Sequence, residues 1–272
     1  MPRSLVRAGR PRSAVVTGAG RGIGRAVAAE LVARGYLVVV TDIDGEAARL
    51  TAAQIGAADS CVLDVTDADA NRAVARRATV LAPLGAWVCN AGVLQEGALT
   101  TLSDGQVRAQ VEVNLLGVLW GVRAAADAMR AEGAAGDIGI IASLSAHAPV
   151  PGLATYAATK AGVLSLATST AAELRSDRIR VHAVCPDGVD TAMVDAMDPH
   201  GGVRSALAAG VMLTPETVAR ELVDLFGRRR VYRTLPAWRG VLARSGSVLP
   251  TVFQPADRAM RWWGARRLRR SA

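Results

Sequence analysis

A tyrosine and a lysine four residues apart, Tyr156 and Lys160, are the residues of this sequence best suited to proton transfer. In a helix, residues at i and i+4 lie on one face about one turn apart, so the phenol and the ammonium would be neighbours. A phenol has an ordinary pKa near ~10, and a nearby positive charge lowers that pKa because it favours phenolate. The pair therefore predicts a general acid/base that exchanges a proton with a substrate oxygen.

Lys160 is the single lysine in a chain that otherwise uses arginine, which occupies 31 positions. A lysine kept against this composition indicates a role that arginine does not fill. A compact ammonium that also donates to ribose hydroxyls is such a role.

A glycine-rich segment near the N-terminus is suited to holding phosphate groups. Residues 17–24 read TGAGRGIG, between a predicted strand and a predicted helix. Glycines let backbone N–H groups approach a pyrophosphate, and a helix N-terminus adds partial positive charge. The spacing is TGxxxGxG and not GxGxxG, because Ile23 stands between Gly22 and Gly24. A glycine-rich turn without a ligand is the alternative.

Asp42 ends the second predicted strand, 18 residues after Gly24. A carboxylate at this point accepts hydrogen bonds from both hydroxyls of an adenosine ribose and repels a 2′-phosphate, which favours NAD over NADP. Arg21 is the contrary signal, since an arginine in the loop can pair with a 2′-phosphate. The alternative for Asp42 is a turn residue in the sequence Asp-Ile-Asp-Gly at 42–45.

The elements that must position these groups are short β-rich runs that alternate with longer helical patterns, which is typical of βαβ units and a parallel sheet. Six strands are predicted at Ser13–Thr17, Tyr36–Thr41, Ser60–Leu63, Ala86–Cys89, Ile138–Ala142 and Ile179–Val184. Helical patterns cover Ile23–Arg34, Asp104–Arg130 and Tyr156–Leu174. The order predicts one α/β domain at 13–227, preceded by a loose arm at 1–12.

These motifs, in this order, resemble the short-chain dehydrogenase/reductase family over roughly residues 13–227. Besides TGxxxGxG and Tyr-x-x-x-Lys, the matching residues are Asp64 and Val65 after the third strand, Asn90, Ala91 and Gly92 after the fourth, Asn114 in a helix, and Ser143. The serine lies thirteen residues before Tyr156, which is the family spacing. The resemblance implies a Rossmann-type doubly wound fold with a central parallel sheet of about seven strands.

The resemblance also implies roles for the matched residues. Tyr156 would act as general acid/base, Ser143 would orient the reacting oxygen, and Lys160 would tune Tyr156 and bind the nicotinamide ribose. Asn114 would hold a water in a proton relay. Cofactor contacts would come from Gly18, Arg21, Gly22, Ile23, Gly24, Asp42, Asp64, Val65, Asn90, Ala91, Gly92, Tyr156, Lys160, Pro186, Val189 and Thr191.

Three of these matches have structural alternatives. Ser145 is a neighbouring competitor for the role of Ser143. Asn114 can serve as a hydrogen-bonded structural amide inside an apolar helix. Asp64 can cap the helix that follows the third strand.

After the sixth strand the sequence departs from the family pattern. It reads Pro-Asp-Gly-Val-Asp-Thr from Pro186 to Thr191, and Asp187 stands where the family usually has glycine. If that position requires a positive φ, the aspartate carries a conformational cost. The segment Ala192–Leu213 fits a substrate-covering loop, and its Met193, Val194, Met197 and Met212 hint at an apolar pocket or at plain packing.

The charge of the chain is unevenly distributed. From Arg228 on there are twelve arginines and one acidic residue, Asp257, while the whole chain carries +8, so residues 1–227 are mildly acidic at about −3. Nucleic-acid binding by the main domain is therefore not expected. The basic extension 228–272, with a helical pattern at Ala256–Arg270 that places Met260 and Trp263 on one side, would dock on an anionic membrane surface or pack on this protein or another subunit.

The remaining composition bears on location and metals. A hydrophobic share of 51% with 21% charged residues is typical of an ordered globular protein. No apolar run is long enough to span a bilayer and no signal-peptide pattern is present. Three separated cysteines are expected to be buried, reduced thiols, which suits the cytoplasm. The three histidines lack ligand spacing, so surface or loop roles and no metal site are expected.

The sequence thus predicts an NAD-dependent oxidoreductase that transfers a hydride between the dinucleotide and a secondary alcohol or ketone, a small-molecule substrate. The family resemblance implies a homodimer or homotetramer built on the long helices. A catalytically idle dinucleotide-binding scaffold or sensor is the alternative from another class, and a membrane-surface adaptor that uses the basic extension is a third.

Overall fold

A computed structural model of the chain describes residues 11–148, 150–198, 203, 212–248 and 266. Its centre is a seven-stranded sheet in the order β3-β2-β1-β4-β5-β6-β7, and every neighbouring pair is parallel. The strands are β1 (Arg12–Val16), β2 (Tyr36–Asp42), β3 (Asp59–Val62), β4 (Leu84–Cys89), β5 (Gly136–Ile141), β6 (Ile179–Pro186) and β7 (Tyr232–Leu235). The predicted Rossmann-type α/β fold is therefore confirmed.

Helices fill the connections between the parallel strands. They are α1 (Gly22–Ala33), α2 (Gly45–Ile55), α3 (Ala68–Leu81), α4 (Asp104–Val111), α5 (Gly117–Ala131), α6 (Ala154–Glu173), α7 (Ala192–Asp195), α9 (Pro215–Val223) and α10 (Ala237–Val248). A π-helical turn, η1 (Glu112–Leu116), separates α4 from α5, and a short 3₁₀ turn, η2 (Leu144–Ala146), follows β5. The predicted helix Asp104–Arg130 is thus two α-helices joined by a wider turn.

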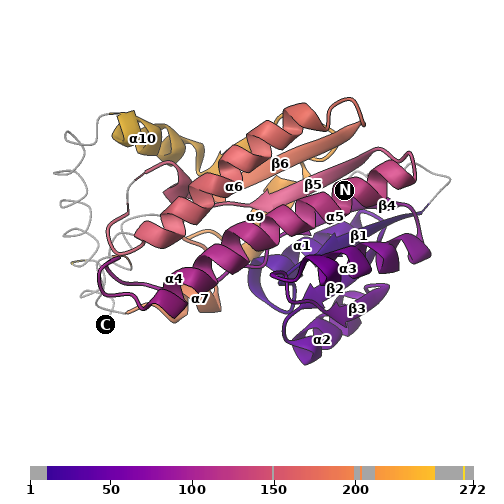
Figure 1. Cartoon of the computed structure of the whole chain (residues 1–272), viewed down its shortest axis with the longest axis horizontal. Coiled ribbons are helices and arrows are strands. Elements are labelled where there is room, and N and C mark those ends of the chain that lie inside the picture. Colours follow the sequence, from indigo (N-terminus) through magenta and orange to yellow (C-terminus); the bar gives the residue numbers. More distant parts are fainter. Residues whose placement is uncertain (1–10, 149, 199–202, 204–211, 249–265, 267–272) are drawn as a thin grey trace.

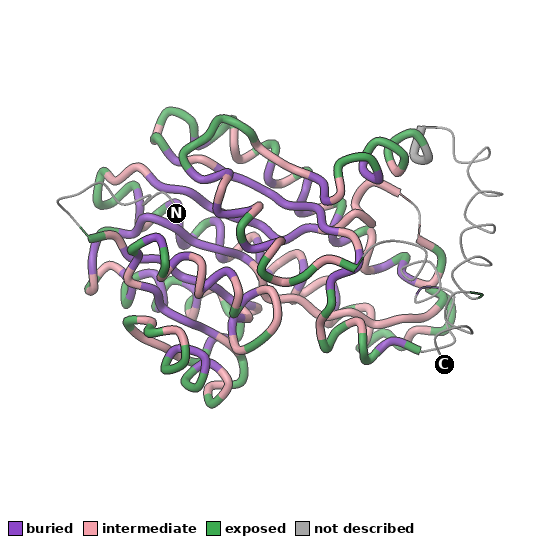
Figure 2. Tube along the Cα trace, turned by 180° about the vertical axis from the view of Figure 1, so that it is seen from behind, coloured by how far each residue is buried: buried purple, intermediate pink, exposed green. Residues whose placement is uncertain are grey.

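The sheet is buried on both faces, which explains its near-continuous apolar strands. In β4, Trp87 and Cys89 pack in the cluster formed with α3, α5 and α6, whereas Ala86 and Val88 pack in the cluster formed with α1, α2 and α9. This alternation follows from the two-residue period of a strand. Figure 2 shows the result as a buried sheet between helices whose outer faces are exposed.

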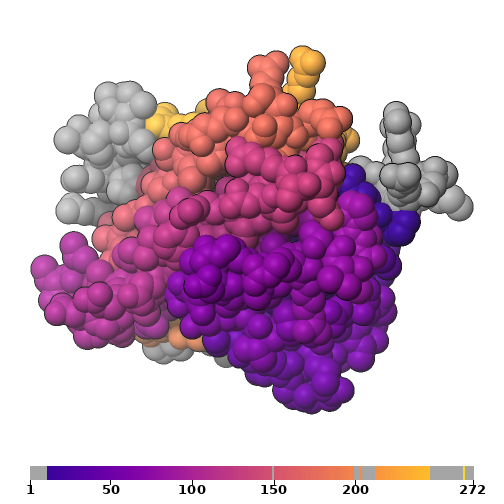
Figure 3. All heavy atoms as spheres, turned by 45° about the vertical axis from the view of Figure 1, so that its right-hand side comes forward, coloured from indigo at the N-terminus to yellow at the C-terminus, as the bar shows by residue number. Residues whose placement is uncertain are grey.

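The strand order reverses between β1 and β4, because the chain runs outward through β2 and β3 before it returns to pair β4 with β1. In open α/β sheets, ligands bind beyond the carboxyl ends of the strands at such a reversal. Figure 1 shows α4, α7 and α10 gathered at one end of the molecule. In Figure 3, the N-terminal part of the chain (indigo and purple) forms one side of the molecule, and the later part (orange) forms another.

The sheet continues past residue 227, where the sequence-based domain ended. The short strand β7 pairs with β6, from Ala183 beside Tyr232 to Pro186 beside Leu235, and α10 follows it. Its sequence, Tyr-Arg-Thr-Leu, is too short and too polar to stand out as a buried strand. The helix expected at Ala256–Arg270 lies outside the described residues except for Arg266, which is helical.

Candidate active site

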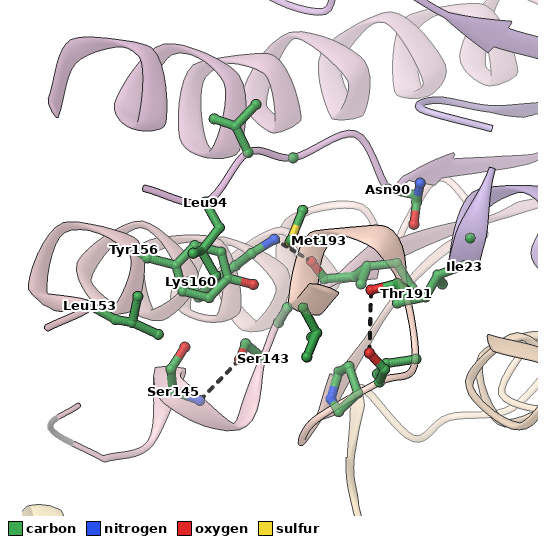
Figure 4. Close-up of a pocket in the computed structure, with 18 of the residues that line it drawn as sticks. Ile23, Asn90, Leu94, Ser143, Ser145, Leu153, Tyr156, Lys160, Thr191 and Met193 are labelled. Atoms are coloured by element: carbon green, nitrogen blue, oxygen red, sulfur yellow. Dashed lines mark hydrogen bonds between the residues drawn. The ribbon is translucent and has the colours of Figure 1, made fainter. Parts of the chain in front are cut away.

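A cleft of about 1480 Å³ lies beyond the carboxyl ends of the strands. It is lined by all the site residues predicted from the sequence except Gly24 and Asn114. Ile23 and Asn90 lie toward one end of the region drawn in Figure 4, and Tyr156, Ser143 and Leu153 lie toward the other. Residues from the first 100 positions and from α6 and the loop after β6 therefore meet in one cavity.

Tyr156 and Lys160 project from the first turns of α6. The Lys160 ammonium lies 5.6 Å from the centroid of the Tyr156 ring, and it donates a 2.9 Å hydrogen bond to the carbonyl of Ile141, the last residue of β5. Ser143 follows β5, and its hydroxyl accepts a hydrogen bond from the Ser145 backbone N–H (3.1 Å; Figure 4). The helix and the strand end therefore bring the three side chains into the same part of the cleft.

Burial controls the acidity of the pair. It raises the pKa of Tyr156 to about 12, an effect that the nearby Ser143 hydroxyl opposes. It lowers the pKa of Lys160 to about 8, because the charged ammonium loses solvent while its partner is a neutral carbonyl. The sequence predicted a lowered pKa at Tyr156, whereas in the structure its pKa is raised, because loss of solvent outweighs the hydrogen bond to Ser143.

Asn114 lies in the π turn η1 and is completely buried. Its side-chain oxygen accepts from the Val93 N–H and its amide donates to the Val93 carbonyl, both at 2.8 Å. The amide also reaches the hydroxyl of Thr159, 3.4 Å away in α6. The side chain therefore ties the loop after β4 to the helix that carries Tyr156 and Lys160, which is the structural role left open by the sequence. π turns of this kind are often found at functional sites.

The glycine loop after β1 forms a cradle that side chains would fill. Gly18 has φ +61, and a Cβ there would lie 2.7 Å from Ala91 Cα. A Cβ at Gly24 would lie 2.2 Å from the Gly18 carbonyl oxygen and 2.5 Å from the Asn90 amide nitrogen. Asn90 in turn donates to the carbonyls of Thr17 and Gly18 at 2.9 and 2.8 Å, so its side chain fixes the shape of the loop.

The N-terminus of α1 faces this cradle. No described side chain caps the helix, so its first N–H groups stay available to an anion. Gly22, Ile23 and Arg21 all line the cleft, and a Cβ on Gly22 would lie 3.5 Å from Thr191 Cγ2 on the far wall. These features fit the pyrophosphate of a dinucleotide.

Asp42 lines the cleft at the end of β2. Its carboxylate accepts from the Gly20 N–H at 2.8 Å and from the Asp44 N–H at 3.1 Å, so it supports the glycine loop and the following turn at once. Exposed Asp64 and buried Val65 line the same region. Asp64 does not cap α3 as the sequence alternative suggested; Asp67 caps it and accepts from the N–H groups of Asp69 and Ala70.

The loop after β6 forms the opposite wall, with Pro186, Val189 and Thr191 lining the cleft. Asp187 does not adopt positive φ, a conformation found among the described non-glycine residues only at Arg178. The conformational cost that the sequence raised for Asp187 is therefore absent. The carboxylate instead forms an ion pair with Arg239 of α10, which also lines the cleft.

The side of the cleft near Tyr156 is apolar. Leu153, Met197 and Val203 form a small buried cluster against which Tyr156, Leu94 and Val194 pack. Met193 also lines the cleft, whereas Met212 is not among its described lining residues. Arg239, Leu242 and Ala243 of α10 were missed by the sequence reasoning, because no motif marks them and they lie in a segment interpreted as an extension.

His182 corrects an expectation, because it is 1% exposed inside β6 and not on the surface. Its ring nitrogens contact the Asp137 carboxylate at 2.9 Å and the Arg230 carbonyl at 2.8 Å. His147 is half-buried in the loop after η2, and His200 lies outside the described residues. Cys89 and Cys185 are buried free thiols as expected, while free Cys61 is only partly buried.

Within the described part of the chain, no group of three or more His, Cys, Asp or Glu side chains is placed to hold a metal ion. In the same residues, no helix combines the length and apolar character needed to cross a bilayer.

Comparison with known proteins decides the family. The sequence model of the short chain dehydrogenase family matches residues 12–201. The chain belongs to the short-chain dehydrogenase family. Its relatives include the "Probable oxidoreductase EphD" of Mycobacterium tuberculosis, 31% identical over 94% of this chain and 48% of that protein. This short-chain dehydrogenase therefore spans about half the length of that relative.

Two further relatives match a smaller part of the chain. The sorbitol dehydrogenase of Cereibacter sphaeroides is 36% identical over 69% of this chain and 74% of its own. The 3-oxoacyl-[acyl-carrier-protein] reductase FabG of Staphylococcus aureus is 35% identical over 68% of this chain and 78% of its own. The relatives of this short-chain dehydrogenase are thus named as an oxidoreductase, a dehydrogenase and a reductase.

Proposed function

We propose that this chain transfers a hydride between NAD(H) and a secondary alcohol or ketone, with Tyr156 as the general acid/base. The observation that carries the proposal is the convergence of Tyr156, Ser143 and Lys160 in the cleft that also contains the glycine cradle. A catalytically idle scaffold would have no need of a buried lysine ammonium beside a partly buried phenol, because burying the charge costs desolvation energy.

A bound nicotinamide dinucleotide would supply the hydride donor or acceptor, held by the glycine loop, Asp42, Asn90, Lys160 and Thr191. The chain supplies the proton. In carbonyl reduction, the Tyr156 hydroxyl donates its proton to the substrate oxygen that Ser143 orients. Its pKa of about 12 means that the phenol carries this proton at neutral pH. In alcohol oxidation the reverse step applies: Tyr156 must first lose its proton, the nearby Lys160 ammonium favours the resulting phenolate, and the phenolate then accepts the alcohol proton.

The preference for NAD is supported by Asp42, whose carboxylate lies at the cleft wall where a 2′-phosphate would be repelled. Arg21 lines the same cleft and would favour NADP. The test is the ratio of kcat/KM with NAD to that with NADP in Asp42→Ala and Arg21→Ala. We expect a fall of at least ~10-fold for Asp42→Ala and little change for Arg21→Ala; the reverse pattern would overturn the assignment of NAD.

Catalysis itself is tested by following NADH absorbance with three substrate classes. The first is sorbitol and other polyols, chosen because one relative is named a sorbitol dehydrogenase. The second is 3-oxoacyl thioesters, chosen because another is named a 3-oxoacyl-[acyl-carrier-protein] reductase. The third is apolar secondary alcohols and ketones. The apolar wall of Leu153, Met197 and Val203 favours the third class. Tight NADH binding with no turnover of any class would support the idle scaffold instead.

Assembly and membrane contact are further parts of the proposal. Family resemblance supports a homodimer or homotetramer packed on the long helices, α6 included, which light scattering of the full chain measures. Trp238 and Val241 on α10 are 63% and 68% exposed and belong to the arginine-rich extension 228–272, which supports contact with an anionic membrane surface. Flotation with phosphatidylglycerol vesicles tests this contact, and loss of binding is expected when residues 249–272 are deleted.

A further inference from the structure

The Asp187–Arg239 ion pair links two segments that the family motifs leave unexplained. Asp187 follows β6 and replaces the glycine usual in the family, and Arg239 lies in α10, beyond the residues 12–201 that the family model matches. The two side chains are 6% and 9% exposed, and both residues line the cleft. The Asp187 N–H also donates to the Leu235 carbonyl at 2.9 Å, so the loop is fixed to β7 as well.

The adjacent face of α10 is packed tightly on β7. A Cβ at Gly240 would lie 2.7 Å from Thr234 Cβ, so the helix approaches the strand without room for a side chain. Arg244 donates to the Thr234 hydroxyl at 3.3 Å, and its guanidinium lies 5.1 Å from the Tyr232 ring. Contacts with β7 and with Asp187 therefore hold α10 at two points. Leu242 and Ala243, one turn beyond Arg239, line the cleft.

A buried ion pair is a poor means of stabilisation, because the loss of solvent around two charges offsets most of their attraction. Burial indeed raises the pKa of Asp187, while Arg239 opposes the rise. Such a pair instead fixes the position of α10 relative to the Asp187 loop, because moving either side chain away leaves a buried charge without a partner. Its two charges also cancel, so the wall that α10 contributes is electrically neutral and, through Leu242 and Ala243, apolar.

We propose that Asp187 and Arg239 are positioning residues that hold α10 as a wall of the cleft, and thereby set the length of apolar substituent that the substrate carries. The inference rests on the proposed function, because it assigns the specificity of the same site. The substrate class is a secondary alcohol or ketone with an extended, uncharged apolar chain that lies against Leu242 and Ala243.

The test uses Asp187→Gly, Arg239→Leu and the charge-exchanged double variant Asp187→Arg/Arg239→Asp. Kinetics are measured with NAD and 2-alkanols from four to ten carbons. Each single variant is expected to raise KM for the longest alcohol at least ~10-fold, with kcat for the shortest alcohol within ~3-fold of wild type, and the double variant is expected to recover part of the loss. The control is Arg233→Leu, which removes an ion pair between β7 and α9 outside the cleft lining.

Hydrogen exchange of the amides at 241–244 provides a readout that needs no turnover. The single variants are expected to exchange at least ~10-fold faster at these amides, and Arg233→Leu is expected to match wild type. Unchanged exchange and unchanged chain-length selectivity in the single variants would overturn the inference. Inactive wild type with faster exchange in the variants would refute the proposed function alone. If the single variants do not fold, Leu242→Trp replaces them, and retained turnover of the longest alcohol in that variant would contradict the proposed wall.

Discussion

Lys160 offers a stability measurement that isolates one buried charge. Burial lowers its pKa from 10.5 to about 8, and a shift of this size corresponds to about 3 kcal/mol of free energy. Below pH ~8 the lysine is charged in both the folded and the unfolded chain, so the folded state bears the whole cost of burying the charge. As the pH rises toward 10.5, the folded chain loses the proton first. The cost disappears and the stability rises.

The variant Lys160→Met keeps the side-chain length but has nothing to titrate. Relative to wild type, it is expected to be more stable at pH 7, and this advantage is expected to shrink by about 3 kcal/mol between pH 7 and pH 10.5. Urea denaturation of both proteins at a series of pH values measures the difference. The other titrating groups are common to both proteins and cancel.

The exposed Arg25→Met serves as the control, because an arginine stays protonated over this range and its difference from wild type should not vary with pH. A Lys160→Met difference that stays constant within about 1 kcal/mol over the same range would refute the reasoning, because the lysine would then have the same pKa in both states.

Two further predictions concern the cradle and the far end of the sheet. Gly24→Ala places a Cβ 2.2 Å from the Gly18 carbonyl oxygen, so calorimetry should show at least a ~10-fold weaker NADH affinity. The control Gly105→Ala, whose Cβ would lie 3.9 Å from the Ser103 hydroxyl oxygen, should bind NADH as wild type does. Equal affinities in the two variants would contradict the role of the cradle. Asp137→Ala should lower the free energy of unfolding by about 3–5 kcal/mol, because it removes the carboxylate that pairs with buried His182 and with partly exposed Arg180. The control Asp127→Ala, at an exposed aspartate, should have little effect. Burial disfavours the charged form of Asp137, yet hydrogen bonds from His182 and Arg180 hold its pKa below the usual value. Its contribution to the free energy of unfolding is therefore present above pH ~4 and is lost as the pH falls through the folded-state pKa. A wild-type advantage over Asp137→Ala that does not decline below pH ~4 would be evidence against this assignment.

The central strands could be predicted because a sheet covered on both faces selects continuous apolar runs such as YLVVVT at 36–41. The glycine loop and the Tyr156–Lys160 pair could be proposed from the sequence, because the spacing of their residues along the chain already indicates which groups come together. β7 could not, since its four residues are ordered by pairing with β6 and not by their own pattern. The π turn at Asn114 likewise depends on the Val93 backbone bonds, which come from a distant loop.

The acidity of the site and the role of Asp187 also lay beyond sequence reasoning. The spacing of Tyr156 and Lys160 indicates contact, but the pKa of each depends on how much solvent the cleft excludes. In the sequence, Asp187 stands out only because the family usually has glycine at this position. Its partner Arg239 lies 52 positions away, in a helix that no motif marks. His182 is a further example, because its sequence neighbours do not indicate that the Asp137 carboxylate lies beside it in the folded chain.

The most direct test of the central claim is the turnover number of Tyr156→Phe with a substrate that the wild-type enzyme oxidises. The account predicts that kcat falls by ~10²- to 10⁴-fold, the usual contribution of a general acid/base, while NADH binding measured by calorimetry persists. A Tyr156→Phe enzyme that turns over within ~3-fold of wild type would contradict the account, because the phenol would then not carry the proton.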